Sequence, residues 1–226
     1  MTVTEVGLMG VKPGLNIMDE TTQEGQVLFG AWNSVIAAPT GPHQVYFGLE
    51  IENPLRIWAF FDWDSLEHHA TFAKTFGGEA VKDLPTILTH GEFTNHVIFK
   101  PFPPAVLRSP VTQVIIAYFP SDFSPGRKDA TAARIQQILE KSHGECTDVK
   151  GLNIGWGVEN NFPVRGGDEG QTGSVLQALI GWPSVVASQK FQETEAFKES
   201  LDSIKALEGV VKSEVFHISC RTLERR

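Results

Sequence analysis

The chain has 226 residues, of which 41% are hydrophobic, so it is long and apolar enough to bury a substantial core. Its formal net charge of −8, with 19 dispersed Lys and Arg residues, argues against nucleic acid or an anionic membrane surface as a partner. It has two cysteines without CxxC spacing, no long apolar run and no signal-peptide pattern at its start, so we expect an intracellular, cytoplasmic protein without a disulfide scaffold.

The first half of the chain predicts the order strand, helix, strand, strand, helix, strand. Apolar residues recur with helical spacing over 27–36, and the Asn53-Pro54 pair supplies a turn between two β-rich segments. Asp64 or Ser65 is a suitable N-cap for the second helix. The expected strands are 2–11, 44–51, 55–63 and 92–99. The second helix is expected to direct Leu66, Ala70, Ala73 and Phe76 inward, and the proline-rich segment 100–110 is predicted to be a linker.

The second half predicts the same order. Its expected strands are 111–119, 152–159, 174–182 and 210–219, with a helix over 131–141 and one long helix before the last strand. The inward stripe of that long helix is Phe197, Leu201, Ile204 and Leu207, and Gly209 is its expected C-cap. The glycine-rich segment 165–173 does not follow the P-loop order of strand, loop and helix, so we predict a hairpin loop there.

Short sequence matches support a duplication. Ile51-Glu52-Asn53 recurs as Val158-Glu159-Asn160, and Trp63-x-Ser65 recurs as Trp182-x-Ser184. Each half thus has the βαββαβ order of ferredoxin-like domains. We predict an α+β chain of two tandem repeats, 1–104 and 105–226, whose antiparallel sheets pack as an intramolecular barrel. The chain would then be a monomeric pseudo-dimer or a homodimer.

These features resemble the dimeric α/β-barrel superfamily. The resemblance rests on Val45-Tyr46-Phe47-Gly48, on Trp63-x-Ser65, and on Glu67, His69 and Phe72 in the next helix. The superfamily includes antibiotic-biosynthesis monooxygenases, EthD-like proteins and polyketide cyclases, and 11–14 with 24–28 resemble its tandem fungal members. The resemblance implies a pocket between sheet and helices for a small hydrophobic or aromatic molecule. The superfamily also includes haem enzymes built from tandem repeats.

One strand of the first half carries an unusual set of side chains. Strand alternation places four of them on one face of 55–63, where they would line a ligand pocket by stacking and one charge-assisted contact. These are Arg56, Trp58, Phe60 and Asp62, and Tyr46 on the neighbouring strand completes the predicted substrate-binding set. The alternative is that Arg56 and Asp62 lie in solvent while the aromatic residues are core. The equivalent second-half positions lack both charges, which favours the first half as the active one.

Histidines are the candidates for proton transfer near neutral pH. His69 is predicted to face the sheet and His68 to face solvent, and two helix neighbours about 100° apart do not readily share a metal ion. We therefore expect no metal site and no cofactor. His96 is a second candidate, with Asp62 as the third catalytic residue. His69 is otherwise a packing residue, and His43 and His217 are weaker pocket candidates.

Two classes of function stay open from the sequence. The first is a cofactor-independent tailoring enzyme, a cyclase, isomerase, lyase or oxygenase, acting on an aromatic or polyketide-like substrate. His69 or His96 would remove a proton and Arg56 would stabilise the resulting anion. The second is a non-catalytic ligand-binding or stress-response protein. A haem-binding enzyme is a third and weaker alternative.

Overall fold

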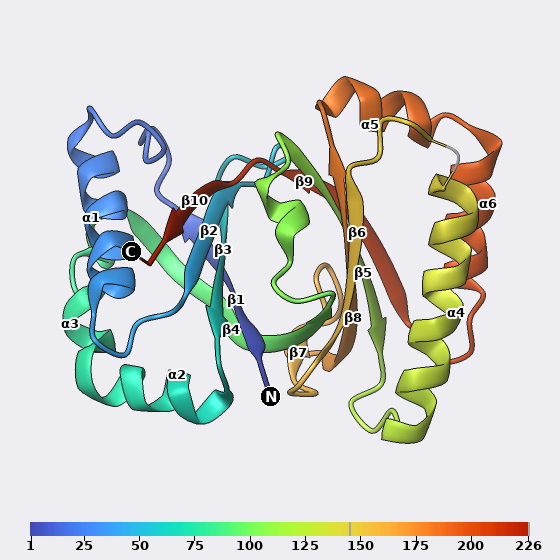
Figure 1. Ribbon diagram of the computed structural model, residues 1–226, viewed down its shortest axis with the longest axis horizontal. Helices are drawn as coiled ribbons and strands as arrows, with labels where there is room; N and C mark the ends of the chain where they lie inside the picture. The colour runs from blue at the N-terminus through green and yellow to red at the C-terminus, as the bar shows by residue number, and fades with distance from the viewer. Residues whose placement is uncertain (145, 226) are drawn as a thin grey trace. The chain divides into compact units, whose positions relative to one another are not determined.

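The computed structural model describes residues 1–144 and 146–225 (Figure 1). The chain forms two compact units. Unit 1 comprises Met1–His96 and Ser219–Arg226, and unit 2 comprises Val97–Ile218. The division between the units falls between His96 and Val97, within the strand Leu88–Lys100. The boundary predicted after Pro104 concerns the sequence repeats and stays a prediction.

Unit 1 is an antiparallel sheet with its helices on one side (Figure 1). Its strand order is β10-β2-β3-β1-β4, in which β2-β3-β1-β4 is the ferredoxin-like arrangement. The strands are β1 (Val3–Val11), β2 (Gln44–Leu49), β3 (Arg56–Trp63), β4 (Leu88–Lys100) and β10 (Arg221–Glu224). The helices are α1 (Gln23–Ala37), α2 (Leu66–Phe72), the π-helix η1 (Ala73–Gly77), α3 (Gly78–Ala80) and the 3₁₀ helix η2 (Leu84–Thr86).

The inward face of α2 differs from the prediction. Leu66, Ala70, Ala73 and Phe76 are exposed, while Phe72 is buried and His69 is partly buried. The Ser65 side chain caps the helix by accepting a hydrogen bond from the backbone N–H of His68, which fixes the helical phase. The π-helix that follows then changes that phase after Phe72.

The strand β10 was not predicted from the sequence. It pairs antiparallel with β2, so the last residues of the chain complete the sheet of unit 1. The side chain of Arg225 donates to the carbonyl oxygens of Ala38, Pro39 and Gly41 beyond α1. A four-residue strand has almost no periodicity of its own, and its position depends on a partner far away in sequence.

Unit 2 repeats the arrangement with the order β4-β6-β8-β5-β9, to which β4 contributes Val97–Lys100. The predicted α+β chain of two tandem ferredoxin-like units is thereby confirmed. The strands are β5 (Val111–Phe119), β6 (Gly151–Gly157), β7 (Phe162–Pro163), β8 (Thr172–Trp182) and β9 (Lys212–Ile218). The helices are the 3₁₀ helix η3 (Ala105–Arg108), α4 (Pro125–His143), α5 (Val185–Gln192) and α6 (Glu195–Lys205).

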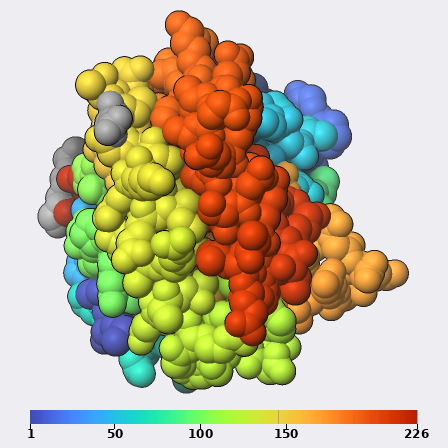
Figure 2. Space-filling model, turned by 90° about the vertical axis from the view of Figure 1, so that its right-hand side faces the viewer, coloured from blue at the N-terminus to red at the C-terminus, as the bar shows by residue number. Residues whose placement is uncertain are grey.

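The long helix predicted in unit 2 is two helices. Thr194 starts a new helix because its hydroxyl accepts a hydrogen bond from the N–H of Phe197 at 3.3 Å. Within α6, Phe197 and Ile204 are buried as predicted, together with Ser200, whereas Leu201 is only half-buried. Figure 2 shows α4 and α6 side by side over one face of unit 2.

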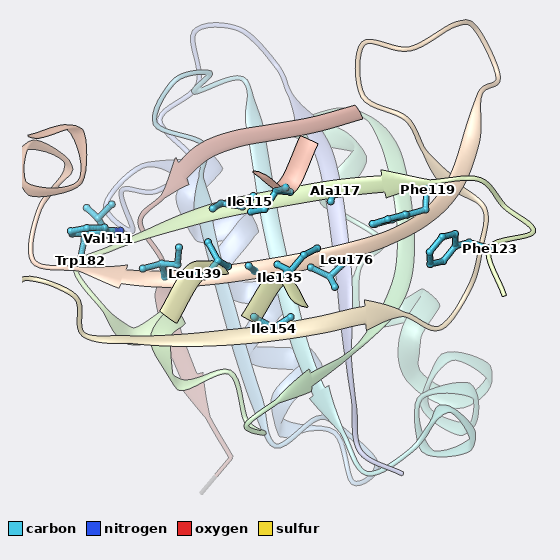
Figure 3. Close-up of a cluster of buried hydrophobic side chains, with 13 residues drawn as sticks. Val111, Ile115, Ala117, Phe119, Phe123, Ile135, Leu139, Ile154, Leu176 and Trp182 are labelled. Carbon is cyan, nitrogen blue, oxygen red and sulfur yellow. The ribbon is translucent and has the colours of Figure 1, made fainter. Parts of the chain in front are cut away.

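The core of unit 2 lies between α4, α6 and the sheet. Figure 3 shows Ile135 and Leu139 of α4 against side chains of β5, β6 and β8. The buried set includes Ile115, Ala117, Ile180 and Trp182. Among the described residues, none of the helices has the length and apolar character needed to cross a membrane.

Candidate functional site

A cavity of about 340 Å³ lies between the sheet of unit 1 and its helices, where the resemblance predicted a pocket. A volume of this size suits a small organic ligand. Its walls are mainly apolar and aromatic, with three polar side chains. The lining consists of Glu5, Gly7, Met9, Trp32, Val35, Phe61, Trp63, His69, Phe72, Ala73, Gly77, Gly78, Val81, Leu84 and Thr94.

Two neighbouring strands form the floor of this cavity. Glu5 of β1 lies opposite Phe61 of β3, and Gly7 lies opposite Ala59, so these residues share one face of the sheet. A Cβ atom added at Gly7 would have its nearest neighbour, the hydroxyl oxygen of Thr94, 3.9 Å away. Gly7 therefore leaves open space where another residue would place a side chain.

The polar end of the cavity is a chain of three side chains from three elements. His69 of α2 places its Nδ1 atom 2.8 Å from Nε2 of His96 on β4, and its Nε2 atom 3.3 Å from Oε2 of Glu5. The same Glu5 oxygen accepts a hydrogen bond from the indole N–H of Trp63 at 3.0 Å. The Trp63 ring also stacks on the His69 ring, at 4.9 Å between centroids and 28° between planes.

The charged and proton-carrying groups of this chain are largely shielded from solvent. The side chains of His69 and Glu5 are 19% and 12% exposed. A carboxylate in such apolar surroundings is costly unless hydrogen-bond donors compensate it, and Trp63 and His69 provide that compensation. Proton donors and acceptors thus meet at the wall of an aromatic cavity.

The helical wall of the cavity is irregular. The chain passes from α2 into the π-helix η1, and Ala73, Gly77 and Gly78 face the cavity with little or no side chain. Single turns of π-helix occur preferentially at functional sites. The irregular turn and the small residues keep this wall away from the sheet.

The other residues predicted for the site lie on the opposite face of β3. Trp58 lies opposite Leu8 and Phe60 opposite Val6, and neither aromatic side chain is among those lining the cavity. The expectation that they share one pocket with His69 is therefore wrong, because the helices of unit 1 cover the other face of the strand. Their predicted role in substrate binding has no test in this geometry and stays a prediction.

The remaining candidates have identified contacts outside the cavity. Asp62 is 1% exposed and accepts a hydrogen bond from the Thr4 hydroxyl at 2.7 Å. Arg56 is half-buried and its Nε atom lies 3.2 Å from Oε1 of Glu92. The buried Tyr46 donates its hydroxyl to Gln44. The alternative that Arg56 and Asp62 both lie in solvent is therefore wrong for Asp62, which is buried.

Sequence reasoning missed Glu5. The available signal was an acidic residue at an inward position of the β-branched segment 2–11, where a buried charge needs partners. Its partners come from residues more than fifty positions away, so no local pattern connects them. Thr94 and Gly7 were missed for the same reason.

Unit 2 holds a different set of residues in the same frame. Val3 pairs with Trp63 as Val111 pairs with Trp182, so Gln113 corresponds to Glu5 and Ile115 to Gly7. Ser65 and Ser184 cap equivalent helices, so Ser188 corresponds to His69. The Ser188 hydroxyl lies 2.8 Å from Nε2 of His217, as His69 lies beside His96.

Comparison with known proteins gives matches among solved structures. No protein-family model matches the sequence, and no curated protein matches it significantly. The chain is similar to an anthrone oxidase-like protein, with 12% identity and a TM-score of 0.68 over 99% of this chain and 93% of that one. A candidate monooxygenase of Fusobacterium nucleatum subsp. nucleatum shows 11% identity and a TM-score of 0.62 over 99% and 94%.

A candidate chlorite dismutase matches with 14% identity and a TM-score of 0.57 over 97% of this chain and 94% of that one. Identities this low establish the fold and no activity. The chain therefore has, over nearly its whole length, the fold of the dimeric α/β-barrel proteins that its sequence resembles.

Proposed function

We propose that unit 1 is a cofactor-independent enzyme that removes a proton from a small aromatic or polyketide-like substrate and supports its reaction with molecular oxygen. The observation that carries this proposal is the pairing of Glu5 with His69 at the wall of an aromatic cavity. Flat rings such as Trp63 and Phe61 suit an aromatic ligand. The fold relationship to monooxygenase candidates supports the same class of reaction.

Glu5 is the proposed general base. A carboxylate offers about four lone-pair sites, so it can accept from Trp63 and His69 and still receive a proton from a ligand. Its position in the lining of the cavity also puts this acceptor within reach of a bound ligand. His69 and His96 then provide a route by which the proton leaves the cavity.

The oxygenation step follows from the chemistry of the substrate. Loss of a proton from a CH₂ group between two aromatic rings that are conjugated with a carbonyl gives a carbanion, which transfers an electron to O₂. Recombination of the resulting radical pair forms a C–O bond, and protonation gives a hydroperoxide. Loss of the second proton from that carbon breaks the O–O bond and releases water. Overall, CH₂ and O₂ become C=O and H₂O, with oxygen as the oxidant.

An oxygen-uptake measurement with an anthrone-type compound tests the proposal. We expect one O₂ to be consumed for each ketone formed, and we expect Glu5→Gln to lower the rate by roughly 10²–10⁴. Glu92→Gln is the matched control, because Glu92 pairs with Arg56 and does not line the cavity. Equal rates for wild type and Glu5→Gln would contradict the role of Glu5. Ligand binding without uptake of oxygen would favour the non-catalytic alternative.

The haem alternative does not fit this cavity. The histidine that lines it, His69, has one ring nitrogen 2.8 Å from His96 and the other 3.3 Å from Glu5. A haem iron needs an imidazole nitrogen with its lone pair directed at the metal. Binding iron through His69 would require one of these two contacts to break, so we assign no haem chemistry to this site.

A further inference from the structure

A second group of side chains in unit 1 has the composition of a metal site. His43, Asp64 and His68 each place one ligand atom so that all three atoms lie within 4.8 Å of one another. His43 Nε2 lies 2.8 Å from Oδ1 of Asp64, and His68 Nδ1 lies 3.4 Å from Oδ2 of the same residue. The expectation of no metal site weighed His68 with His69 and overlooked His43, which immediately precedes β2 and lies far from both in the sequence.

The backbone fixes the positions of all three residues. His43 immediately precedes β2, where its N–H donates to the carbonyl of Asp62 and its own carbonyl accepts from the N–H of Arg225. Asp64 follows β3 directly. His68 lies in the first turn of α2, where its N–H is held by the Ser65 cap. Three separate structural constraints therefore converge on this corner of the unit.

The ligand atoms of the three side chains lie close together. The ring centroids of His43 and His68 are 6.2 Å apart and their planes are inclined at 62°. The His68 ring also packs edge-on against Trp63 at 5.3 Å, which limits its rotation. His43 and Asp64 are 48% and 66% exposed, so an ion would have free access from solvent. His43 Nε2 contacts Oδ1 of Asp64, and His68 Nδ1 accepts a hydrogen bond from the backbone N–H of Asp64 at 3.4 Å, so metal binding would replace both contacts.

We propose that His43, Asp64 and His68 bind a divalent transition metal ion, with Zn²⁺ as the representative ion. Two imidazole nitrogens and one carboxylate oxygen form a donor set that favours Zn²⁺, Ni²⁺ or Cu²⁺ over Ca²⁺ or Mg²⁺. Three protein ligands leave a coordination position for water or an external ligand. The adjacent residues His68 and His69 would thus serve two sites, and both contact Trp63, His68 at 88° between ring planes and His69 at 28°.

Calorimetric titration of Zn²⁺ into the tag-free full-length protein, first freed of bound metal with a chelator, tests this site. We expect one ion per chain and competition between metal and protons at low pH. Asp64→Asn, His43→Gln and His68→Gln should each weaken binding by more than about tenfold, since even loss of a supporting partner of a metal ligand costs 10- to 100-fold. Zn²⁺ should also raise the melting temperature of the wild type and not of these variants.

His90→Gln is the matched control. His90 is an exposed histidine 3.9 Å from Glu92, so it has a carboxylate neighbour, but the described residues offer no third ligand beside it. We expect its affinity for Zn²⁺ to equal that of the wild type. The proposal is overturned if the wild type binds Zn²⁺ no better than the His43→Gln/His68→Gln double variant, or if binding survives substitution of all three residues.

Discussion

The two units place different residues on the same framework. In unit 1 the helix-facing positions of the first strand hold Glu5 and Gly7, and both residues line the cavity. In unit 2 the equivalent positions hold Gln113 and Ile115, and Ile115 belongs to the packed core (Figure 3). A cavity left by missing side-chain volume lowers the free energy of unfolding, whereas a filled core raises it. One unit therefore fills these positions with packed side chains, whereas the other leaves a cavity there, which is the ligand site that we propose.

Filling the cavity tests this comparison with the largest expected effect. Gly7→Ile introduces the residue that unit 2 has at this position, and the added Cβ atom would meet no neighbour closer than 3.9 Å. We expect binding of an aromatic ligand to weaken by roughly 100-fold or more, because a change of one or more methylene groups in a pocket already costs 10- to 200-fold. Fluorescence titration would measure it.

The stability of Gly7→Ile separates a filled cavity from a damaged fold. We expect the free energy of unfolding to be unchanged or higher, because a β-branched residue replaces glycine in a strand. Gly30→Ala, at an open position of α1, is the control and should bind normally. Undiminished ligand binding by a folded Gly7→Ile variant would place the binding site elsewhere.

One substitution can replace the contact between His69 and His96 by the serine–histidine contact that unit 2 has at the equivalent position. His69→Ser reproduces the contact between Ser188 and His217, which the chain already accommodates. If His69 takes part in proton transfer, the rate should fall by roughly 100-fold, while the melting temperature should fall only modestly because Trp63 still donates to Glu5. A loss of stability with a normal rate would instead identify His69 as a packing residue.

Unit 2 contains a buried histidine whose protonation affects stability. His143 is buried against the rings of Phe191, Trp182 and Phe197. Burial lowers its pKa from 6.5 to about 4, and its hydrogen bond to the carbonyl of Leu139 opposes this only in part. The unfolded chain therefore takes up the proton first as the pH falls.

The stabilisation associated with neutral His143 is complete above pH 6.5 and is lost as the pH falls to about 4. From linkage, the loss amounts to about 3 kcal/mol. Urea unfolding of wild type and His143→Leu at pH 7 and pH 4.5 would measure it, and the variant should show the smaller difference between the two pH values. An equal difference in both proteins would show that other groups cause the acid sensitivity.

The smallest effect is expected at Arg56, on the opposite face of the sheet of unit 1. Arg56→Gln removes its contact with Glu92, which is worth about 0.2–1 kcal/mol at such a partly exposed pair. The cavity is lined without Arg56, so we expect less than about a twofold change in rate. A large loss of activity in Arg56→Gln would restore the substrate-binding role that the sequence predicted for it.

The sequence predicted the fold more fully than the site for a physical reason. Periodic apolar residues and turn residues such as Pro54 act locally, so the order of strands and helices follows from them. Which face of β3 meets the helices depends on packing across the sheet, and alternation alone does not decide it, because both faces carry large apolar residues. His69 and His96 were predicted as catalytic candidates and lie in contact, whereas Glu5 and the cavity above Gly7 depend on distant partners.

The most direct test of the account is a crystal structure of the full-length protein with a bound anthrone-type ligand. We expect the ligand in the cavity of unit 1, against the rings of Trp63 and Phe61, with its acidic C–H group directed at the carboxylate of Glu5. The Gln113 and Ser188 region of unit 2 should stay filled by protein side chains. A ligand bound in unit 2, or against Trp58 and Phe60 on the other face of β3, would contradict the assignment of Glu5 and His69 as the functional centre.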